Sequence, residues 1–267
     1  SGARTFRNTS PIAGVVWHAA DTLNLYASYG QGFETPTFAE MAYRPGGGGL
    51  NLALDAATSV SYEIGLKWLP GAGQRVNAAL FHADTEQEIV VDAAAGGRTT
   101  YRNAGTTRRR GAEFVWDGEL GRGLAAHVNF TWLQAVFVDT FVSGLPPVEV
   151  PAGARLPGVP AQQAFGALAW TPVGWPGFSA GVEVQHVGRV YVNDRNAQCA
   201  PAYTLGNARV GFTQPAGRAT WTGYVRVNNV TDVGYAGSVI VGDTNGRYFE
   251  PAPGRNWVGG VSVVVAF

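Results

Sequence analysis

The sequence predicts an all-β protein, a transmembrane antiparallel β-barrel to which this chain contributes about eleven strands. Two observations carry this prediction. Apolar side chains alternate with polar ones at a period of two residues, and short turns alternate with long loops along the whole chain. The 19 basic residues balance the 19 acidic ones. This balance excludes nucleic acid as the main partner, because phosphate binding needs a surplus of basic residues.

The strands follow from the alternation. The clearest is the segment 58–69, TSVSYEIGLKWL, whose even-numbered residues from Val60 to Trp68 are apolar, while Glu63 and Lys67 lie on the other face. The segments 22–31, 122–138 and 218–230 alternate in the same way. The expected strands cover 9–19, 22–31, 57–69, 74–90, 101–118, 122–138, 161–172, 178–191, 202–214, 218–230 and 255–267.

The connections between these strands are of two kinds. Short ones such as PGAGQ (70–74) and GELGR (118–122) are typical of tight turns. Strict alternation of short and long connections places all short turns at one rim of an antiparallel meander and all long loops at the other, as in outer-membrane barrels. The long loops are rich in Gly, Pro, Arg and Asn and are expected at 31–56, 91–100, 139–160, 193–201 and 232–254.

A soluble β-sandwich is the alternative that would also explain alternating strands. Strand length favours the membrane, because several expected strands exceed the roughly five to six residues usual in soluble sheets. The rim asymmetry favours it too, since a sandwich gives no reason for long loops on one side only. Aromatic residues near strand ends fit the girdles found at membrane interfaces; these are Trp68, Trp116, Trp132, Trp170 and Trp257.

The chain ends in NWVGGVSVVVAF, an alternating strand with an aromatic last residue. This stretch resembles the C-terminal signal that the outer-membrane assembly machinery reads on bacterial barrel proteins. With the last residue at the periplasmic rim, the short turns are periplasmic and the long loops extracellular. Strand parity then fits strands 12 to 22 of a 22-stranded plugged barrel. The residues expected to carry the signal are Trp257, Val261, Val263, Val265 and Phe267.

An ordered set of motifs resembles the TonB-dependent receptors of bacterial outer membranes. The segment 25–42, LYASYGQGFETPTFAEMA, resembles their strand-to-loop signature, and 59–68, SVSYEIGLKW, resembles the strand that follows. The segment 101–118, YRNAGTTRRRGAEFVWDG, is similar to their motif Tyr-x-Asn-Ala-Gly…Arg-Gly-x-Glu. The resemblance covers essentially the whole chain. It implies energised uptake of a scarce solute across the outer membrane, without covalent chemistry.

Loop residues are similar to those of a narrower subgroup, the receptors for the redox cofactor pyrroloquinoline quinone. The stretches GFETPT, EIVVD and NGRYFEPAPGRN carry this likeness. It implies pyrroloquinoline quinone as the first ligand, with a ferric siderophore as the alternative. A barrel that binds or adheres without transport is the alternative from another class. A barrel enzyme such as a lipase or protease is disfavoured, because no catalytic motif is present.

The resemblance also implies partners. These are outer-membrane lipid, the barrel assembly machinery, and the TonB–ExbB–ExbD complex of the inner membrane acting through an N-terminal plug domain. Neither the plug nor its coupling box is visible in the sequence. Residues 1–267 are therefore interpreted as one unit, the C-terminal part of the barrel, from a longer receptor or a truncated gene. No resident cofactor or metal is expected, since the four His residues are dispersed among strands.

A ligand site is expected at the extracellular rim, where Arg forks and aromatic faces would suit a small anionic solute or a ferric chelate. The candidates are Arg44, Arg98, Tyr101, Arg102, Tyr191, Asn193, Arg195, Arg247 and Tyr248. The basic run from Arg108 to Arg110 is not one patch, because alternation sends neighbouring residues to opposite faces. We expect these arginines to bond inward-facing acids such as Glu113.

Overall fold

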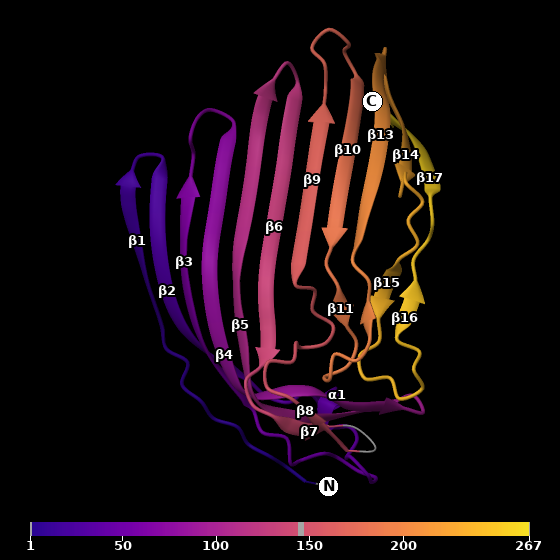
Figure 1. The fold of residues 1–267 in the computed structure, drawn as a ribbon. Coiled ribbons are helices and arrows are strands. Elements are labelled where there is room, and N and C mark those ends of the chain that lie inside the picture. The colour runs from indigo at the N-terminus through magenta and orange to yellow at the C-terminus, as the bar shows by residue number, and fades with distance from the viewer. Residues whose placement is uncertain (1, 144–146, 267) are drawn as a thin grey trace.

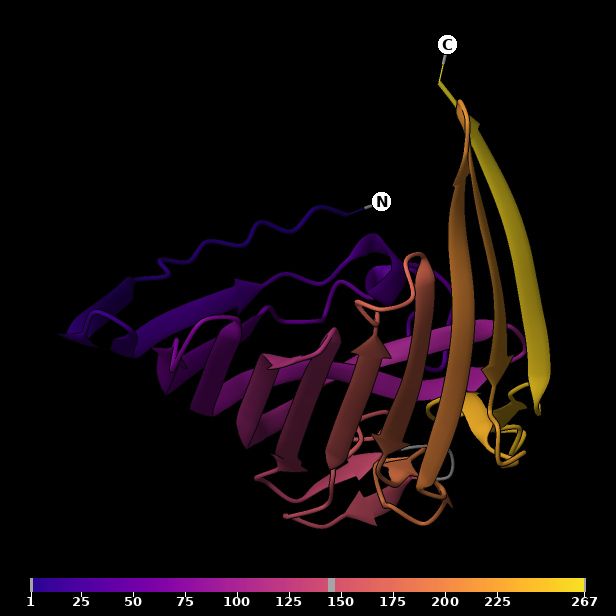
Figure 2. The same ribbon diagram turned by 90° about the horizontal axis from the view of Figure 1, so that it is seen from above.

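The computed structural model describes residues 2–143 and 147–266. Eleven strands form one antiparallel sheet in the order β1-β2-β3-β4-β5-β6-β9-β10-β13-β14-β17 (Figure 1). Seen from above, the sheet curves through a wide arc (Figure 2). Each strand overlaps one of the expected segments, although the bounds differ by several residues at some of them. The strands are β1 (Ile12–Ala20), β2 (Leu23–Glu34), β3 (Ala57–Trp68), β4 (Gln74–Ala95), β5 (Arg98–Gly121), β6 (Leu124–Phe137), β9 (Gln162–Trp170), β10 (Phe178–Val187), β13 (Tyr203–Ala216), β14 (Ala219–Asn228) and β17 (Asn256–Val265).

The register divides the side chains of the sheet into two faces, because cross-strand partners in an antiparallel sheet point the same way. Trp68 lies opposite Val76, which lies opposite Trp116. We call this side the outer face. It is apolar and uncovered by the described chain: Ile64 is 58% exposed and Val261 77% exposed. Among the described residues, the only other sheets have two strands each, so the second layer of a sandwich is absent there.

The opposite side, the inner face, carries polar side chains that pair across strands. The Tyr26 hydroxyl donates to Glu63 Oε1 at 2.6 Å between β2 and β3. Arg226 on β14 donates through Nη1 to Glu183 Oε1 on β10 at 2.8 Å. An apolar outer face with a polar inner face is the pattern of a membrane barrel wall whose interior is wet.

The two rims of the sheet differ as the sequence predicts (Figure 1). One rim, the short-turn rim, carries only tight connections, and the other, the long-loop rim, carries four long connections and the end of the β4–β5 hairpin. The long loops are more ordered than expected, since they hold short hairpins and one helical turn. These are β7 (Phe141–Ser143) with β8 (Val148–Val150), β11 (Val190–Tyr191) with β12 (Cys199–Ala200), β15 (Ala236–Val239) with β16 (Phe249–Pro251), and α1 (Phe38–Met41).

The helical turn α1 is held by a capping box, in which Thr37 and Glu40 satisfy each other's main-chain amides. Among the described residues, no helix is long and apolar enough to cross a membrane.

The expected long loop at 91–100 is wrong. Strands β4 and β5 continue through it and pair up to Ala95 and Arg98, with one register shift between Val91 and Ala93. Gly96 and Gly97 close the turn at φ values of 58° and 73°. Two residues with positive φ are what a tight hairpin turn requires, and glycine adopts them without strain. The result is a long hairpin that extends beyond the rest of the sheet (Figure 1).

The buried apolar cluster lies at the base of the long loops. Phe137 and Val150 are almost completely buried, and Phe141 packs edge-on against Phe137 with ring centroids 4.7 Å apart. The other members of the cluster are Ala104, Ala135, Ala154 and Leu156. This cluster fixes strands β7 and β8 against β5 and β6, and so positions one wall of the site described next.

Candidate functional site

The β4–β5 hairpin crosses the long-loop rim and joins the loop between β15 and β16 through hydrogen bonds to main-chain atoms. The Ala94 N–H donates to the Gly242 carbonyl at 3.2 Å, and the Thr244 N–H donates to the Ala94 carbonyl at 3.0 Å. The Gly242 N–H in turn donates to the Val192 carbonyl at 2.9 Å. We call these contacts the clasp. They hold three loops together that are far apart in the sequence.

Beside the clasp lies a cavity of about 440 Å³, which we call the rim cavity. Its volume falls in the range of roughly 300–1,000 Å³ that is usual for small-molecule sites. Four segments supply its walls: the β4–β5 hairpin, strands β7 and β8, the loop after β11 and the loop before β16. The lining residues are Val91, Asp92, Ser143, Val148, Val150, Asn193, Asp194, Arg195, Val241, Gly242, Asp243, Thr244 and Tyr248.

The guanidinium group of Arg102 on β5, close to this cavity, has hydrogen-bond donors without a partner among the described residues. Its guanidinium stacks on the Phe141 ring, 4.2 Å from the centroid, and Nη1 donates to the Val142 carbonyl at 2.7 Å. Its Nε lies 3.6 Å from Asp92 Oδ1, beyond hydrogen-bonding distance. Nε and Nη2 are buried and have no hydrogen-bond partner within the described chain. An unsatisfied buried donor costs about 1–3 kcal/mol, so Arg102 is held here at a local cost that the described chain does not relieve.

Asp194 is the most buried acid of the cavity, with 8% of its surface exposed. Ser143 Oγ donates to its Oδ2 at 3.0 Å. Burial raises the pKa of the Asp194 carboxyl, and the nearby negative charge of Asp92 adds to the effect. The Ser143 hydrogen bond and the positive charge of Arg102 oppose it. A raised pKa lets this carboxyl keep its proton to higher pH, and a protonated carboxyl can donate a hydrogen bond to a ligand.

The cavity therefore offers both donors and acceptors to a polar solute. Arg195 can supply charged donors, Asn193 and Tyr248 can donate or accept, and Asp92 and Asp243 accept. In the described part of the chain, no group of three or more His, Cys, Asp or Glu residues is placed to hold a metal ion. The arrangement can bind a solute by hydrogen bonds and charge.

Of the expected ligand residues, three line the rim cavity together: Asn193, Arg195 and Tyr248. Arg102 lies beside it. The others do not line it but lie at the same rim. Arg98 stacks 5.1 Å above the Tyr43 ring, the Tyr101 carbonyl accepts from Asn51, Arg44 lies in an exposed loop, Tyr191 lines a neighbouring pocket, and the Arg247 N–H donates to Asp243.

The acids and the hydroxyl of the cavity were not expected. A search for basic and aromatic groups that would suit an anion does not select these residues, which are Asp92, Ser143, Asp194 and Asp243. Asp194 lies between two expected residues, so proximity in the sequence was a usable signal for it.

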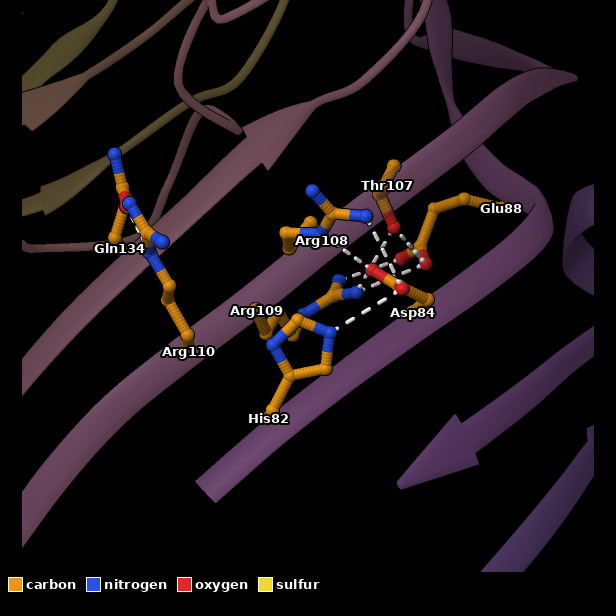
Figure 3. A network of polar contacts seen from close by, with 8 residues as sticks. All are labelled: His82, Asp84, Glu88, Thr107, Arg108, Arg109, Arg110 and Gln134. Carbon is orange, nitrogen blue, oxygen red and sulfur yellow. Dashed lines mark hydrogen bonds and ion pairs between the residues drawn. The ribbon is translucent and has the colours of Figure 1, made fainter. Parts of the chain in front are cut away.

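The basic run on β5 divides between the two faces, as alternation predicts (Figure 3). Arg108 Nε donates to Asp84 Oδ1 at 2.7 Å, and Arg110 Nε donates to the Gln134 side chain. Arg109 donates through Nη2 to Glu88 Oε1 at 2.7 Å. The expected bonds to Glu113 are wrong. The acids on neighbouring β4 lie directly beside the arginines, whereas Glu113 lies farther along β5, opposite Ala79 and Thr131.

The residues expected to carry the assembly signal lie on the last strand of the sheet. Trp257, Val261, Val263 and Val265 alternate along β17 on the outer face, and Val263 lies opposite Trp221. Phe267 lies outside the described residues. The alternation supports one apolar row on this strand, and its role in assembly stays a prediction.

A curved antiparallel sheet with an apolar outer face and a polar inner face is typical of part of the wall of a membrane β-barrel. The chain belongs to the family described as TonB dependent receptor-like, beta-barrel, whose model matches residues 1–230.

Relatives with known names agree with this assignment. The ferrioxamine receptor of Yersinia enterocolitica is 25% identical over 240 residues, which are 87% of this chain and 30% of the relative. Two solved structures share the fold. The siderophore receptor PiuA from Acinetobacter baumannii has a TM-score of 0.73 at 20% identity, covering 95% of this chain and 35% of PiuA. The ferric yersiniabactin uptake receptor FyuA from Yersinia pestis has a TM-score of 0.71 at 21% identity, covering 97% of this chain and 37% of FyuA. The chain thus spans about a third of the length of these relatives.

Proposed function

We propose that this chain forms part of the wall and ligand-binding rim of an outer-membrane receptor that imports a ferric siderophore by TonB-dependent transport. Family membership over residues 1–230 supports the receptor class. The names of the ferrioxamine and ferric yersiniabactin receptors support a siderophore as the ligand. They favour it over pyrroloquinoline quinone, the ligand that the loop motifs suggested first.

The observation that carries the proposal is the rim cavity with the unpaired donors of Arg102 beside it. Siderophore chelates present anionic or carbonyl oxygens, and a guanidinium binds such oxygens with charge-assisted hydrogen bonds. The protonated form of Asp194 would donate a further bond. Tyr248 offers an aromatic edge at the wall of the cavity. In this proposal the ferric iron is cargo, and the protein contacts only its chelator.

The remaining parts of the receptor follow from the same proposal. The eleven strands form half of a 22-stranded barrel, with the long-loop rim outside the cell. A plug domain, which we place outside residues 1–267, occupies the barrel. The TonB–ExbB–ExbD complex acts on this plug, and the inner face of the described sheet lines the path that opens.

The test is a binding and uptake assay on cells that express the native protein. Radioactive iron is presented as ferrioxamine B or as ferric yersiniabactin, and pyrroloquinoline quinone is presented separately. We expect saturable uptake of one ferric siderophore that is abolished in cells without TonB. Uptake of pyrroloquinoline quinone alone would overturn the siderophore proposal. Binding without uptake in cells that have TonB would instead favour a non-transporting barrel.

A variant pair tests the cavity itself. Arg102→Met should weaken siderophore binding about 10- to 150-fold, because a charged hydrogen bond contributes about 1.5–3 kcal/mol. Arg75→Met is the matched control, because Arg75 pairs with Asp117 near the short-turn rim. Equal affinity of the Arg102→Met variant and the unchanged protein would contradict the placement of the ligand in the rim cavity.

A further inference from the structure

Three arginines lie on the outer face just beyond its apolar band, on the side of the long-loop rim. The register places Tyr62, His82, Arg110 and Gln134 in one row across β3 to β6. The next row toward the rim contains Asp84, Arg108, Val136 and Arg155. Because cross-strand partners share a face, these arginines point away from the inside of the barrel and toward the surroundings of its wall.

A groove of about 500 Å³ lies directly below this basic cluster on the same strands. On the outer face it is lined by Leu25, Ile64, Leu66, Ala78, Leu80 and Ala112. Two alanines between larger aliphatic side chains leave a depression in the wall. Ala112 is two residues from Arg110 on the same face of β5, so one end of the groove lies next to the position of Arg110 in the sheet.

Arg108 and Arg110 differ in their partners, because only Arg108 forms an ion pair with another described residue. Arg108 is paired with Asp84, through Nε to Oδ1 at 2.7 Å and Nη2 to Oδ2 at 3.2 Å. Arg110 uses Nε for Gln134 and makes no ion pair with any described residue. Its two terminal nitrogens remain available, and Figure 3 shows Arg110 and Gln134 set apart from the Asp84–Arg108 pair. Glu86 is the other acid on this face of β4.

We propose that the groove and the basic cluster together form a binding site for one phosphate-bearing membrane lipid. An acyl chain would occupy the apolar groove, and the phosphate would accept hydrogen bonds from Arg110 and Arg108. Guanidinium groups match phosphate oxygens in charge and in fork geometry. The groove lies toward the middle of the apolar band and the arginines lie toward the long-loop rim. A lipid places its acyl chain and its phosphate in the same order along the membrane normal. A free inorganic anion has no acyl chain and would leave the apolar groove empty.

The position of Tyr62 supports this assignment. Tyr62 is 53% exposed and packs against Tyr29, with ring centroids 5.3 Å apart. Aromatic side chains of this kind mark the level of lipid headgroups in membrane proteins. Because Tyr62 shares its row with Arg110, the Arg110 guanidinium is placed at the depth where lipid phosphates lie.

The test measures lipid binding to the native protein purified in detergent. The probes are dioctanoyl phosphatidic acid, dioctanoyl phosphatidylcholine and dioctanoylglycerol, which share their tails and differ in the headgroup. Bound lipid is counted by native mass spectrometry during titration. We expect phosphatidic acid to bind most tightly and its affinity to fall as salt is added. Equal binding of phosphatidic acid and dioctanoylglycerol by the unchanged protein would overturn the proposal, and this comparison needs no variant.

Variants locate the site. Arg110→Gln should weaken phosphatidic acid binding about fivefold, and the double change Arg108→Gln with Arg110→Gln about thirtyfold, from the usual contribution of a basic residue near anionic lipid. Arg109→Gln is the matched control, since it removes the same charge from the neighbouring position on the opposite face. Resistance to trypsin shows whether each variant is folded. Equal weakening by Arg109→Gln and Arg110→Gln would mean that lipid responds to net charge only, and would refute the site.

Discussion

Replacing Val225 by arginine places a charge in the apolar band of the outer face and tests which face of the sheet meets lipid. Val225 lies on β14 between Val210 on β13 and Gly259 on β17. It is 47% exposed and touches no side chain that could pair with a guanidinium within the described sheet. The expected result is a large loss of stability in a membrane, because a charge at this depth loses its water.

The magnitude follows from the depth of the residue. Trp221 marks one edge of the band on β14, and Val227, which lies opposite Trp257, marks the other. At about 3.4 Å per residue and a tilt of about 40°, these two rows are separated by about 15 Å along the membrane normal. Val225 lies about 3 Å from the middle of this interval. The cost for arginine near the midplane is about 2–4 kcal/mol, which lowers the folding equilibrium constant about 150-fold at 3 kcal/mol.

The assay is unfolding of the native protein in lipid vesicles with guanidinium chloride, followed by tryptophan fluorescence. The amount of folded protein in the outer membrane of expressing cells gives a second readout. Ser262→Arg is the matched control, because Ser262 is an exposed residue of the inner face on neighbouring β17. An equal loss of stability in both variants, or no loss in Val225→Arg, would refute the assignment of the outer face to lipid.

Three further predictions concern other parts of the chain. Asp194→Asn should stabilise the protein at neutral pH but not below pH 3.8, because ionising the buried carboxyl as pH rises costs stability; unfolding titrations at both pH values check the sign. Glu183→Gln leaves Arg226 with a weakened pair on the inner face and should cost about 1–2 kcal/mol in the same titration, while unchanged stability would count against the pair. Deleting Phe267 should lower the amount of folded protein in the outer membrane, and normal levels on an immunoblot of membrane fractions would contradict its role as an assembly signal.

The main sheet could be predicted because apolar and polar residues alternate along its strands. A strand with one face in an apolar medium and the other in water must alternate, and the segment from Val60 to Trp68 does so without interruption. The same period of two is enough to separate Arg109 from Arg108 and Arg110. Placement of the turns followed from composition, since Gly and Pro gather at both kinds of connection.

Local reversals of the pattern could not be predicted. Gln87 adopts a φ of 57°, and after it the side chain of Glu88 reaches Thr107 and Arg109 on the inner face. Simple alternation from Asp84 would have placed Glu88 outside. The residue type of Gln87 does not predict a left-handed backbone conformation, because glutamine adopts this conformation rarely.

The rim cavity was only partly predictable for a related reason. Asn193, Arg195 and Tyr248 were found by their chemistry, but the sequence has no means of indicating that their loops meet. The loops meet through the clasp. Its residues Ala94 and Gly242 carry no polar side chain, so their residue types do not indicate a contact. The burial that raises the pKa of Asp194, and the stacking of Arg102 on Phe141, are likewise products of loops packing together.

The clasp has a consequence for how the ligand preference of this wall could change over generations. Its bonds from Ala94 to Gly242 and from Gly242 to Val192 run between main-chain atoms, so they depend little on which side chains the loops carry. Substitutions at cavity positions such as Asn193 or Tyr248 can therefore alter the chemistry offered to a solute while the loops keep their mutual positions. A rim held in this way separates the scaffold from the side chains that line the cavity, so one inherited architecture can carry many different linings.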